Sequence, residues 1–294
     1  ISYIIDLLKY EAVLIEFIIL INKLNFMRLS SKQLNKINTI FSNLKLKKND
    51  KIHLSIDLVK LHAFLKIKNI NFSKFFNLLL KLIHIKVGKN GIFAIPVFNF
   101  SCIKSKKFSK KNSPGETGSF GNLLLKKYFK NRTYHPINSF LIFGKNKIEY
   151  INYEHENCHG ATSIWRKFLE HKFKLVTIGH HYVRSFTIVH YLENLSNVIY
   201  RFKKRIIIDY STNNKTFKRK FSFFARKLNI CKHSTITFEC DKFFLNKKIA
   251  SLYKCNNLIK KKTKLVKYIN NNKNKNTMLD FNNVIKLKKK YQNL

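Results

Sequence analysis

The sequence predicts an α/β protein with a mostly parallel central sheet flanked by helices and a smaller, partly antiparallel C-terminal lobe. Short apolar runs of strand type alternate with segments of helical spacing up to residue 200. All eight glycines and all three prolines lie between Gly88 and Gly179, where turns must separate these elements. With 294 residues, 45% of them hydrophobic, the chain can bury the core of one large domain or two lobes.

The individual helices and strands follow from apolar periodicity and from capping signals. Ser30 or Ser31 is placed to cap the first helix, and Gly88 closes the second. Pro96 cannot donate a backbone hydrogen bond, so its strand lies at an edge or ends there. The pattern predicts helices over 31–43, 72–86, 119–130, 162–172 and 186–195, and strands, the first entered by a turn, over 48–56, 91–98, 139–144 and 174–179.

The pattern weakens after residue 200. Residues 198–210 and 233–240 are expected to form strands of an antiparallel lobe. The chain from residue 258 is rich in Lys and Asn, a composition typical of poorly ordered segments. These changes divide the chain into an N-terminal amphipathic helix, a core, a C-terminal lobe and a tail, over residues 1–30, 31–200, 201–257 and 258–294.

The chain is strongly basic. Its formal net charge is +43, from 58 Lys and Arg against 15 Asp and Glu. Such a charge favours anionic partners. The alternative is that the many Lys residues, which are spread over the whole chain, reflect an AT-rich coding sequence. Five cysteines without a CxxC pair argue against a disulfide framework and a zinc site, and favour the cytoplasm. Charges interrupt the apolar N-terminal segment, so neither a membrane span nor a signal peptide is expected.

A candidate catalytic pair lies on the last predicted helix of the core. Thr187, His190 and Glu193 are spaced by three residues, which places neighbours on one helix face. A carboxylate one turn from an imidazole can orient the ring and raise its basicity. His190 is therefore a candidate general base with Glu193 as its partner. The alternative is a structural histidine, which is the commoner role of His on a helix.

Other residues suggest different chemistry. Cys158 lies between His155 and His159, so a cysteine–histidine nucleophile is conceivable, and these two histidines with His180 and His181 could bind a metal. No neighbouring residue in the sequence is of a kind that would lower the pKa of the Cys158 thiol, so the nucleophile has no support. The histidines have no known metal-ligand spacing, and we expect no metal.

The loops 113–118, 131–138 and 179–186 contain Gly, Pro or His and follow predicted strands. Sites gather in loops of this kind in parallel sheets. Phosphate loops of the GxxxxGK[ST] and GxGxxG types are absent.

Taken in order, these motifs resemble the aminoglycoside 3-N-acetyltransferase family, which uses acetyl-CoA. Its pattern runs GD-x-hydrophobic-VHSSL, G-x-L-hydrophobic-MP-x-F, R-S-x-HP-x-x-S, H-D-x-x-FGEGSP, LLLG and N-T-x-x-H-x-x-E. The matching segments here are NDKIHLSIDL (49–58), GIFAIPVF (91–98), RTYHPINSFLIFG (132–144), HENCHGATSI (155–164), KLVTIG (174–179) and FTIVHYLE (186–193). The resemblance covers about residues 32–200, and its strength is the shared order of the motifs.

The resemblance implies direct transfer of an acetyl group from acetyl-CoA to an amine, through a ternary complex. His190 corresponds to the catalytic histidine of the family, and Glu193 to the acidic residue that orients it. The positions implied near the acceptor are Thr187, His155 and His135, and those implied near the coenzyme are Ser55, Asp57, Arg132, Ser139 and Ser163. The chain departs from the pattern at Ser55 and Ile56, at Phe186, and in the turn that begins at Gly160.

The charge of the chain bears on the acceptor. An aminoglycoside is a polycation, which a net charge of +43 repels, whereas CoA phosphates or a nucleotide-linked sugar are attracted. Our hypothesis is therefore an amino sugar or related amine of surface-polysaccharide assembly. Two alternatives stay open: a catalytically eroded member that acts as a binding protein, and a basic nucleic-acid-binding protein. No recognisable nucleic-acid-binding fold supports the second, so no specific nucleic acid is expected.

Overall fold

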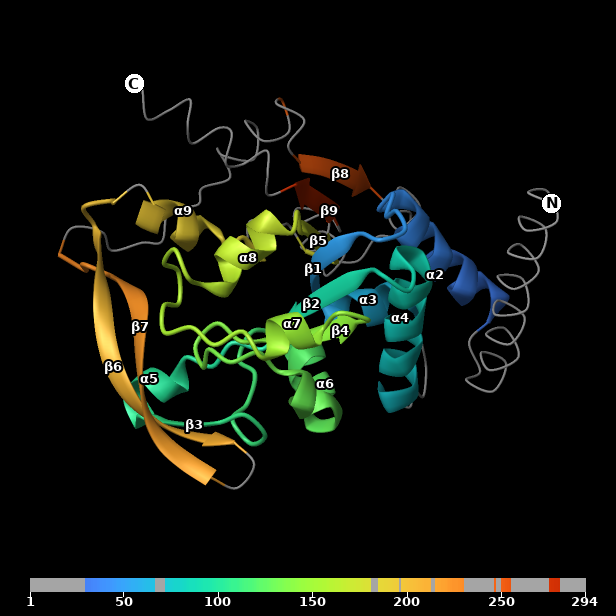
Figure 1. Ribbon diagram of the computed structural model, residues 1–294. Coiled ribbons are helices and arrows are strands. Elements are labelled where there is room, and N and C mark those ends of the chain that lie inside the picture. The colour runs from blue at the N-terminus through green and yellow to red at the C-terminus, as the bar shows by residue number, and fades with distance from the viewer. Residues whose placement is uncertain are drawn as a thin grey trace, which may run out of the picture.

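The computed structural model describes residues 30–66, 72–180, 185–195, 197–212, 215–229, 246, 250–254 and 275–280. The N-terminal helix expected over residues 1–30 and the strand expected over 233–240 lie outside these residues, apart from Ser30. The described part forms two sheets with helices around the larger one (Figure 1). This arrangement confirms the predicted α/β class, with a mostly parallel sheet in the core and a second, partly antiparallel sheet.

The larger sheet has six strands in the order β4-β2-β1-β5-β9-β8. Its central strands β2, β1 and β5 run parallel, and the strands on either side of them pair antiparallel. The register places Ser55 opposite Thr177 near the carboxyl ends of β1 and β5. The strands are β1 (Lys51–Ile56), β2 (Ile92–Pro96), β4 (Phe140–Gly144), β5 (Lys174–Ile178), β8 (Ala250–Lys254) and β9 (Lys275–Asp280).

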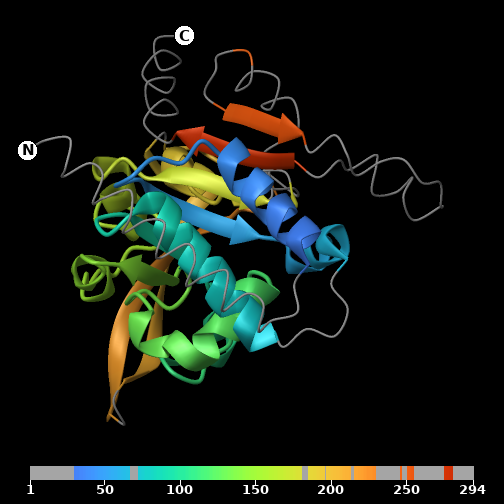
Figure 2. The same ribbon diagram turned by 90° about the vertical axis from the view of Figure 1, so that its right-hand side faces the viewer.

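Helices cover both faces of this sheet. On one face, Ile52, Leu54 and Ile56 of β1 pack in a core with helices α2, α3, α4 and α6, and Figure 2 shows α2 and α4 lying across that face. The other core joins β2, β4 and β5 to α7, α8 and α9. Side chains alternate along a strand, so His53 and Ser55 point toward this second face. The helices are α2 (Ser31–Asn43), α3 (Leu58–Leu65), α4 (Phe72–Val87), α6 (Ser119–Tyr128), α7 (Ile148–Ile151), α8 (Ile164–Glu170) and α9 (Val189–Leu195).

A long hairpin forms most of the smaller sheet. Strands β6 (Arg201–Thr212) and β7 (Lys215–Arg226) pair antiparallel along their whole length, and β3 (Lys107–Ser109), which follows the short helix α5 (Ser101–Ser105), pairs parallel with β6. An isolated bridge joins Asn157 to Ser222 on β7. The hairpin, which is orange at the left of Figure 1, is thereby attached to the core loops. The predicted C-terminal lobe and tail thus contribute strands to sheets that also contain core strands.

The local sequence signals agree with most element boundaries. Ser30 caps α2 in a capping box, because its side chain accepts from the Gln33 N–H and the Gln33 side chain accepts from the Ser30 N–H. Gly88 follows α4 with a φ of +74°, a left-handed conformation suited to a helix end. Pro96 is the last residue of β2, as expected from its missing donor. Strand β7 was not expected, because Lys and Arg interrupt its apolar residues.

Candidate active site

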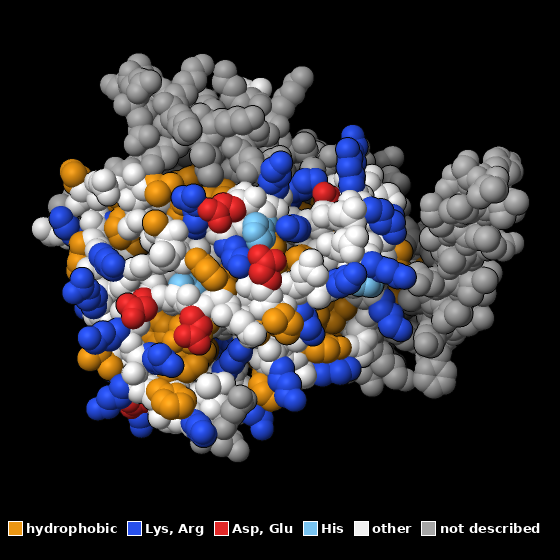
Figure 3. All heavy atoms as spheres, in the orientation of Figure 1, with side chains coloured by type: hydrophobic (Ala, Val, Ile, Leu, Met, Phe, Trp, Pro, Cys, Tyr) orange, Lys and Arg blue, Asp and Glu red, His pale blue; other side chains and the backbone are white. Residues whose placement is uncertain are grey.

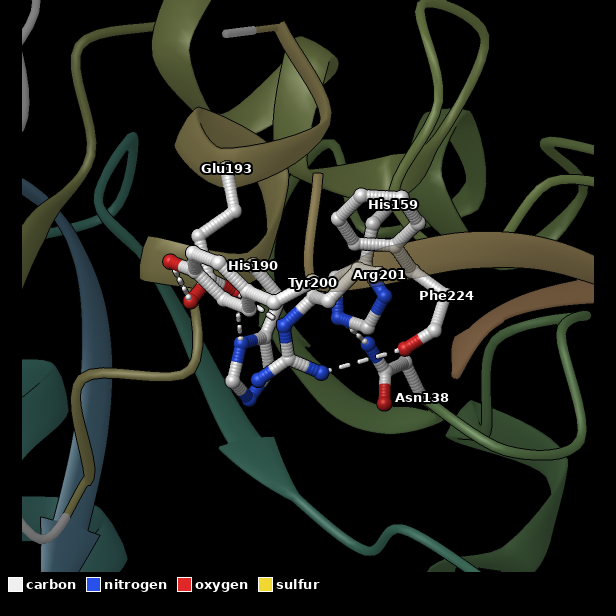
Figure 4. Close-up of polar contacts among 7 residues, drawn as sticks. All are labelled: Asn138, His159, His190, Glu193, Tyr200, Arg201 and Phe224. Atoms are coloured by element: carbon white, nitrogen blue, oxygen red, sulfur yellow. Dashed lines mark hydrogen bonds and ion pairs between the residues drawn. The ribbon is translucent and has the colours of Figure 1, made fainter. Parts of the chain in front are cut away.

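The residues predicted as a catalytic pair are in contact at the start of α9. Nδ1 of His190 lies 2.7 Å from Oε2 of Glu193, which follows one turn later (Figure 4). The side chain of Glu193 is 8% exposed and that of His190 is 24% exposed. Thr187 precedes the helix, and its carbonyl accepts a 3.1 Å hydrogen bond from the His190 N–H. The helix start therefore fixes the imidazole beside a buried carboxylate while leaving part of the ring accessible.

Two residues beyond α9 hold the carboxylate of Glu193. The Tyr200 hydroxyl donates to Oε1 at 3.0 Å, and Nε of Arg201 lies 2.6 Å from Oε2. Arg201 also donates from Nη1 to the carbonyl of Phe224 on β7, at 3.2 Å. Figure 4 shows these side chains converging on Glu193. Glu193 thus connects α9 to the hairpin of the smaller sheet.

The charge state of Glu193 follows from these partners. Burial alone would raise the pKa of Glu193, but the hydrogen bond and charge of His190, the charge of Arg201 and the hydrogen bond of Tyr200 outweigh it and lower the pKa. An ionised carboxylate can only accept, so Nδ1 of a neutral His190 donates to it. The lone pair of that ring is then on Nε2. This is the tautomer that a histidine needs in order to take a proton from a substrate.

A second histidine packs against His190. The ring of His159 meets that of His190 edge to face, with centroids 5.4 Å apart, and lies parallel to Trp165 at 6.4 Å. The Asn138 side-chain amide lies 2.7 Å from Nε2 of His159. Burial lowers the pKa of His159 well below its ordinary value, with help from the positive charges of His190, His135 and Arg201. His159 is therefore a neutral, buried ring at the side of the candidate base.

The two histidines implied near the acceptor form a stacked pair. The rings of His135 and His155 are 5.4 Å apart and nearly parallel. Nδ1 of His135 accepts from the Ile137 N–H, and its Nε2 lies 3.2 Å from the Glu156 carbonyl. Nδ1 of His155 lies 3.0 Å from the carbonyl of Tyr153. Both side chains are buried.

Arg132 and Ser139, implied near the coenzyme, fasten a core loop to β2. The Arg132 guanidinium is fully buried and donates to Ser139 Oγ at 3.0 Å, to the Ser113 carbonyl at 2.6 Å and to the Val97 carbonyl at 2.9 Å. It also lies over the ring of Phe108, 4.5 Å from the centroid. All of these partners are protein groups. We therefore expect Arg132 and Ser139 to act on the site through the position of the 131–139 loop.

Ser55 and Asp57 flank the carboxyl end of β1. Ser185 donates to Ser55 Oγ at 2.9 Å, and Nε2 of His180 lies 2.8 Å from Ser185 Oγ. Ser55 and Ser185 are half-buried, so this hydrogen-bonded chain reaches the surface. The carboxylate of Asp57 caps α3 by accepting from the Lys60 N–H at 3.0 Å. The hydroxyls of Ser55 and Ser185 and the start of α3 at Asp57 therefore lie at the same strand end.

The remaining candidates are buried. Ser163 precedes α8, and its Oγ has no hydrogen-bond partner among the residues described. Cys158 is buried with Cys102 in the core under the hairpin. Burial raises the pKa of the Cys158 thiol, with a further contribution from Cys102, which opposes formation of a thiolate nucleophile. Within the described ranges, no group of three or more His, Cys, Asp or Glu is arranged to hold a metal ion.

A model of one protein family matches residues 94–266. Its description is aminoglycoside 3-N-acetyltransferase, and the match spans more than half of the chain. The chain belongs to the aminoglycoside 3-N-acetyltransferase family. The match extends past residue 200 into the β6–β7 hairpin, which the sequence motifs had not covered. A comparison with curated protein sequences finds no match.

Solved structures share the fold of this family member. A sisomicin-bound AAC-VIa structure superposes with a TM-score of 0.63 at 13% identity, covering 87% of this chain and 96% of that one. The binary complex of AAC-IIIb with CoASH gives 0.63 at 14%, covering 87% and 95%. The YokD protein of Bacillus subtilis gives 0.60 at 14%, covering 86% and 92%. Enzymes of the family are acetyltransferases that use acetyl-CoA as the acetyl donor.

Tyr200 and Arg201 are the site residues that the sequence did not reveal. They contact Glu193 from seven and eight positions further along the chain, beyond the end of α9, where no helical spacing indicates a contact. The scarcity of arginine was an available signal, since Arg occurs at only eight positions. Among the arginines in the described part of the chain, Arg132 and Arg201 are buried. In the described part of this acetyltransferase-family chain, no helix is long and apolar enough to cross a membrane.

Proposed function

We propose that the protein is an acetyl-CoA-dependent N-acetyltransferase that acetylates an amine of an amino sugar. The observation that supports this most directly is the 2.7 Å contact between Nδ1 of His190 and the buried carboxylate of Glu193. It occurs in a chain that belongs to a family of N-acetyltransferases. The proposal includes a site of action in the cytoplasm, where acetyl-CoA is available.

His190 acts as the general base in this proposal. A protonated amine has no lone pair and cannot attack a thioester, so its proton must be removed. Nε2 of His190 takes that proton as the nitrogen adds to the acetyl carbon, and Glu193 stabilises the imidazolium that forms. The carbon–nitrogen bond forms, the carbon–sulfur bond breaks, and the CoA thiolate leaves and is protonated. Arg201 and Tyr200 keep Glu193 ionised and in place during this transfer.

The basic surface of the protein suits acetyl-CoA, which is a thioester with several phosphate groups. Lys and Arg side chains are spread over the face shown in Figure 3, and few Asp or Glu lie among them. Such a surface attracts the phosphates of acetyl-CoA. The half-buried hydroxyls of Ser55 and Ser185 at the end of β1 are donors of the kind that can stabilise charge on a carbonyl oxygen. We propose this strand end, with Asp57 beside it, as the coenzyme side of the site, and we keep Ser163, at the start of α8, as a further candidate for that side.

The acceptor that we propose is an amino sugar of modest positive charge or none. A polycationic aminoglycoside needs carboxylates around it. Several carboxylates of the described part are already paired with basic side chains, namely Asp50 with Lys174, Asp57 with Lys60, Glu170 with Arg166 and Glu193 with Arg201. The net charge of +43 repels a polycation further.

Thiol release from acetyl-CoA tests the catalytic proposal. The purified protein is incubated with acetyl-CoA and an acceptor, either a sugar nucleotide, a simple amino sugar or a kanamycin-type drug. His190→Gln and Glu193→Gln should reduce kcat by roughly 10²–10⁴-fold, the usual contribution of a positioned general base. His84→Gln on α4 is the matched control, because His84 is also a helical histidine but lies exposed on another helix.

The outcomes separate the candidate functions. Turnover that depends on His190 and not on His84 supports the proposal. Efficient turnover of kanamycin-type drugs with none of the amino sugars would contradict the proposed acceptor. CoA binding without thiol release, unchanged in His190→Gln, would instead identify a catalytically eroded member that acts as a binding protein.

A further inference from the structure

A small cavity lies beside the catalytic pair, between the 157–161 loop and the β6–β7 hairpin. Its volume is about 210 Å³, which suits one chemical group of a ligand more than a whole molecule. Its lining includes Asn157, His159, Asn194, Lys203 and Ser222. None of the described residues that line it is an Asp or Glu. Among those described lining residues, the only one with a charged side chain is Lys203, on β6.

The wall of the cavity contains a buried donor that lacks an acceptor. The Asn138 side-chain amide donates to Nε2 of His159, which leaves the single proton of this neutral ring on Nδ1. His159 is 7% exposed, and its Nδ1 has no hydrogen-bond partner among the residues described. An unsatisfied buried donor costs stability. A ligand that brings an acceptor into the cavity would remove that cost.

The other polar groups of the wall are held in place by one another. Ser222 Oγ donates to the Asn157 side-chain carbonyl at 2.8 Å, and the Asn157 amide donates to Thr162 at 3.0 Å. These bonds fix the loop against β7, so the cavity is shaped before a ligand arrives. Preformed sites of this kind bind with a smaller loss of conformational entropy.

The cavity adjoins the catalytic pair through several of its lining residues. His159 packs against the ring of His190 (Figure 4). Asn194 follows Glu193 on α9, and the carbonyl of Phe224, another lining residue, accepts from Arg201. A ligand with one group in this cavity therefore has its neighbouring atoms close to His190.

We propose that this cavity binds an anionic group, a phosphate or a carboxylate, on the acceptor sugar, so that the acceptor is an acidic amino sugar. This inference rests on the proposed function, since it names the substrate class of the same site. Lys203 neutralises the anion, while Nδ1 of His159 donates to one of its oxygens. The positive charge of the protein, which repels a polycation, then helps to select an anionic amino sugar as the substrate.

Binding of a matched pair of sugars tests this inference without requiring turnover. D-glucosamine 6-phosphate and D-glucosamine differ only in the phosphate, and their Kd values are measured by calorimetry in the absence of acetyl-CoA. Wild-type protein should bind the phosphate ester roughly tenfold to a hundredfold more tightly, the range for one charge-assisted hydrogen bond. Lys203→Glu should abolish that preference. Lys204→Glu is the matched control, because it makes the same charge change one residue along β6, at a side chain outside the cavity lining.

A second arm distinguishes an anion of the acceptor from an anion of the coenzyme. The Kd of CoA should be the same in Lys203→Glu and Lys204→Glu. Equal binding of the two sugars by wild-type protein, or equal loss in both lysine variants, would overturn the inference. Weakened CoA binding in Lys203→Glu alone would also overturn it, by assigning the anion to the coenzyme. Failure of thiol release with the phosphate preference intact would count against the proposed function and leave the binding site standing.

Discussion

Acidification from about pH 7.5 to about pH 5 should destabilise the folded protein strongly, because buried histidines remain neutral in it. Burial, together with the smaller effect of the charge of His180, lowers the pKa of His53 to about 3. Burial lowers the pKa of His155 to about 4, although its hydrogen bond to the Tyr153 carbonyl acts in the opposite direction. Burial also lowers the pKa values of His135 and His159. Four buried histidines thus oppose protonation in the folded state.

The sign and size of the effect follow from proton binding. A histidine in the unfolded chain has a pKa near 6.5, so below that pH the unfolded state binds protons that the folded state does not. Stability present at neutral pH is therefore lost as the pH falls from about 6.5 toward the folded pKa values. His53 and His155 each contribute a loss of about 2 kcal/mol at about pH 5, or about 4 kcal/mol together. Domains are typically stable by about 5–15 kcal/mol, so this loss is substantial.

Urea denaturation at a series of pH values measures the effect. The single tryptophan, Trp165, is fully buried, so its fluorescence reports unfolding. His53→Leu removes one titrating group from a site lined by Phe140 and Trp165. It should reduce the pH dependence of the unfolding free energy by about 2 kcal/mol between neutral pH and about pH 5, whatever its effect on absolute stability. Equal unfolding free energies at both ends of the range, or an unchanged pH slope in His53→Leu, would refute this reasoning.

Other substitutions test the packing and the site. Arg132→Lys should lower the free energy of unfolding by about 3–5 kcal/mol in urea denaturation, because one ammonium cannot replace three guanidinium hydrogen bonds. Gly121→Ala should cost about 1–3 kcal/mol, measured the same way, since the new Cβ would lie 2.4 Å from the Pro96 carbonyl oxygen. Arg201→Met should lower kcat about tenfold with little change in the KM for acetyl-CoA. The substitution removes the ion pair that holds Glu193 and leaves the proposed binding site of the acetyl donor unchanged. An unchanged result in any of these measurements contradicts its stated cause.

The sequence predicted the core of the fold because its local and long-range signals agree. Segments such as 91–98 and 174–179 are predominantly apolar, as buried strands between helices must be, and they became β2 and β5. Helix 31–43 has a capping residue at its start and apolar residues at helical spacing. The β7 strand lacked such a signal, because residues 215–220, among them Lys218, Arg219 and Lys220, are exposed on both faces of the hairpin. Its pairing depends on β6, which no local pattern indicates.

The candidate site was predictable only in the part that local spacing encodes. His190 and Glu193 are one helical turn apart, so a helix brings them together whatever surrounds it. Lys203 and Asn157 are far apart in the sequence and meet at one cavity only because β7 pairs with the loop at residue 157. A contact of that kind depends on sheet register, and a single sequence contains no measure of it.

The environment of Glu193 argues for a retained catalytic role over an eroded one. An exposed His–Glu pair on a helix needs no further support, but a carboxylate that is 8% exposed must have donors to stay ionised. This chain places one of its eight arginines, itself 6% exposed, against that carboxylate. A double-mutant cycle of Glu193→Gln and Arg201→Met decides the point. If the two residues serve catalysis through each other, their effects on kcat are far from additive, whereas additive effects on kcat with coupling only in stability indicate a structural pair.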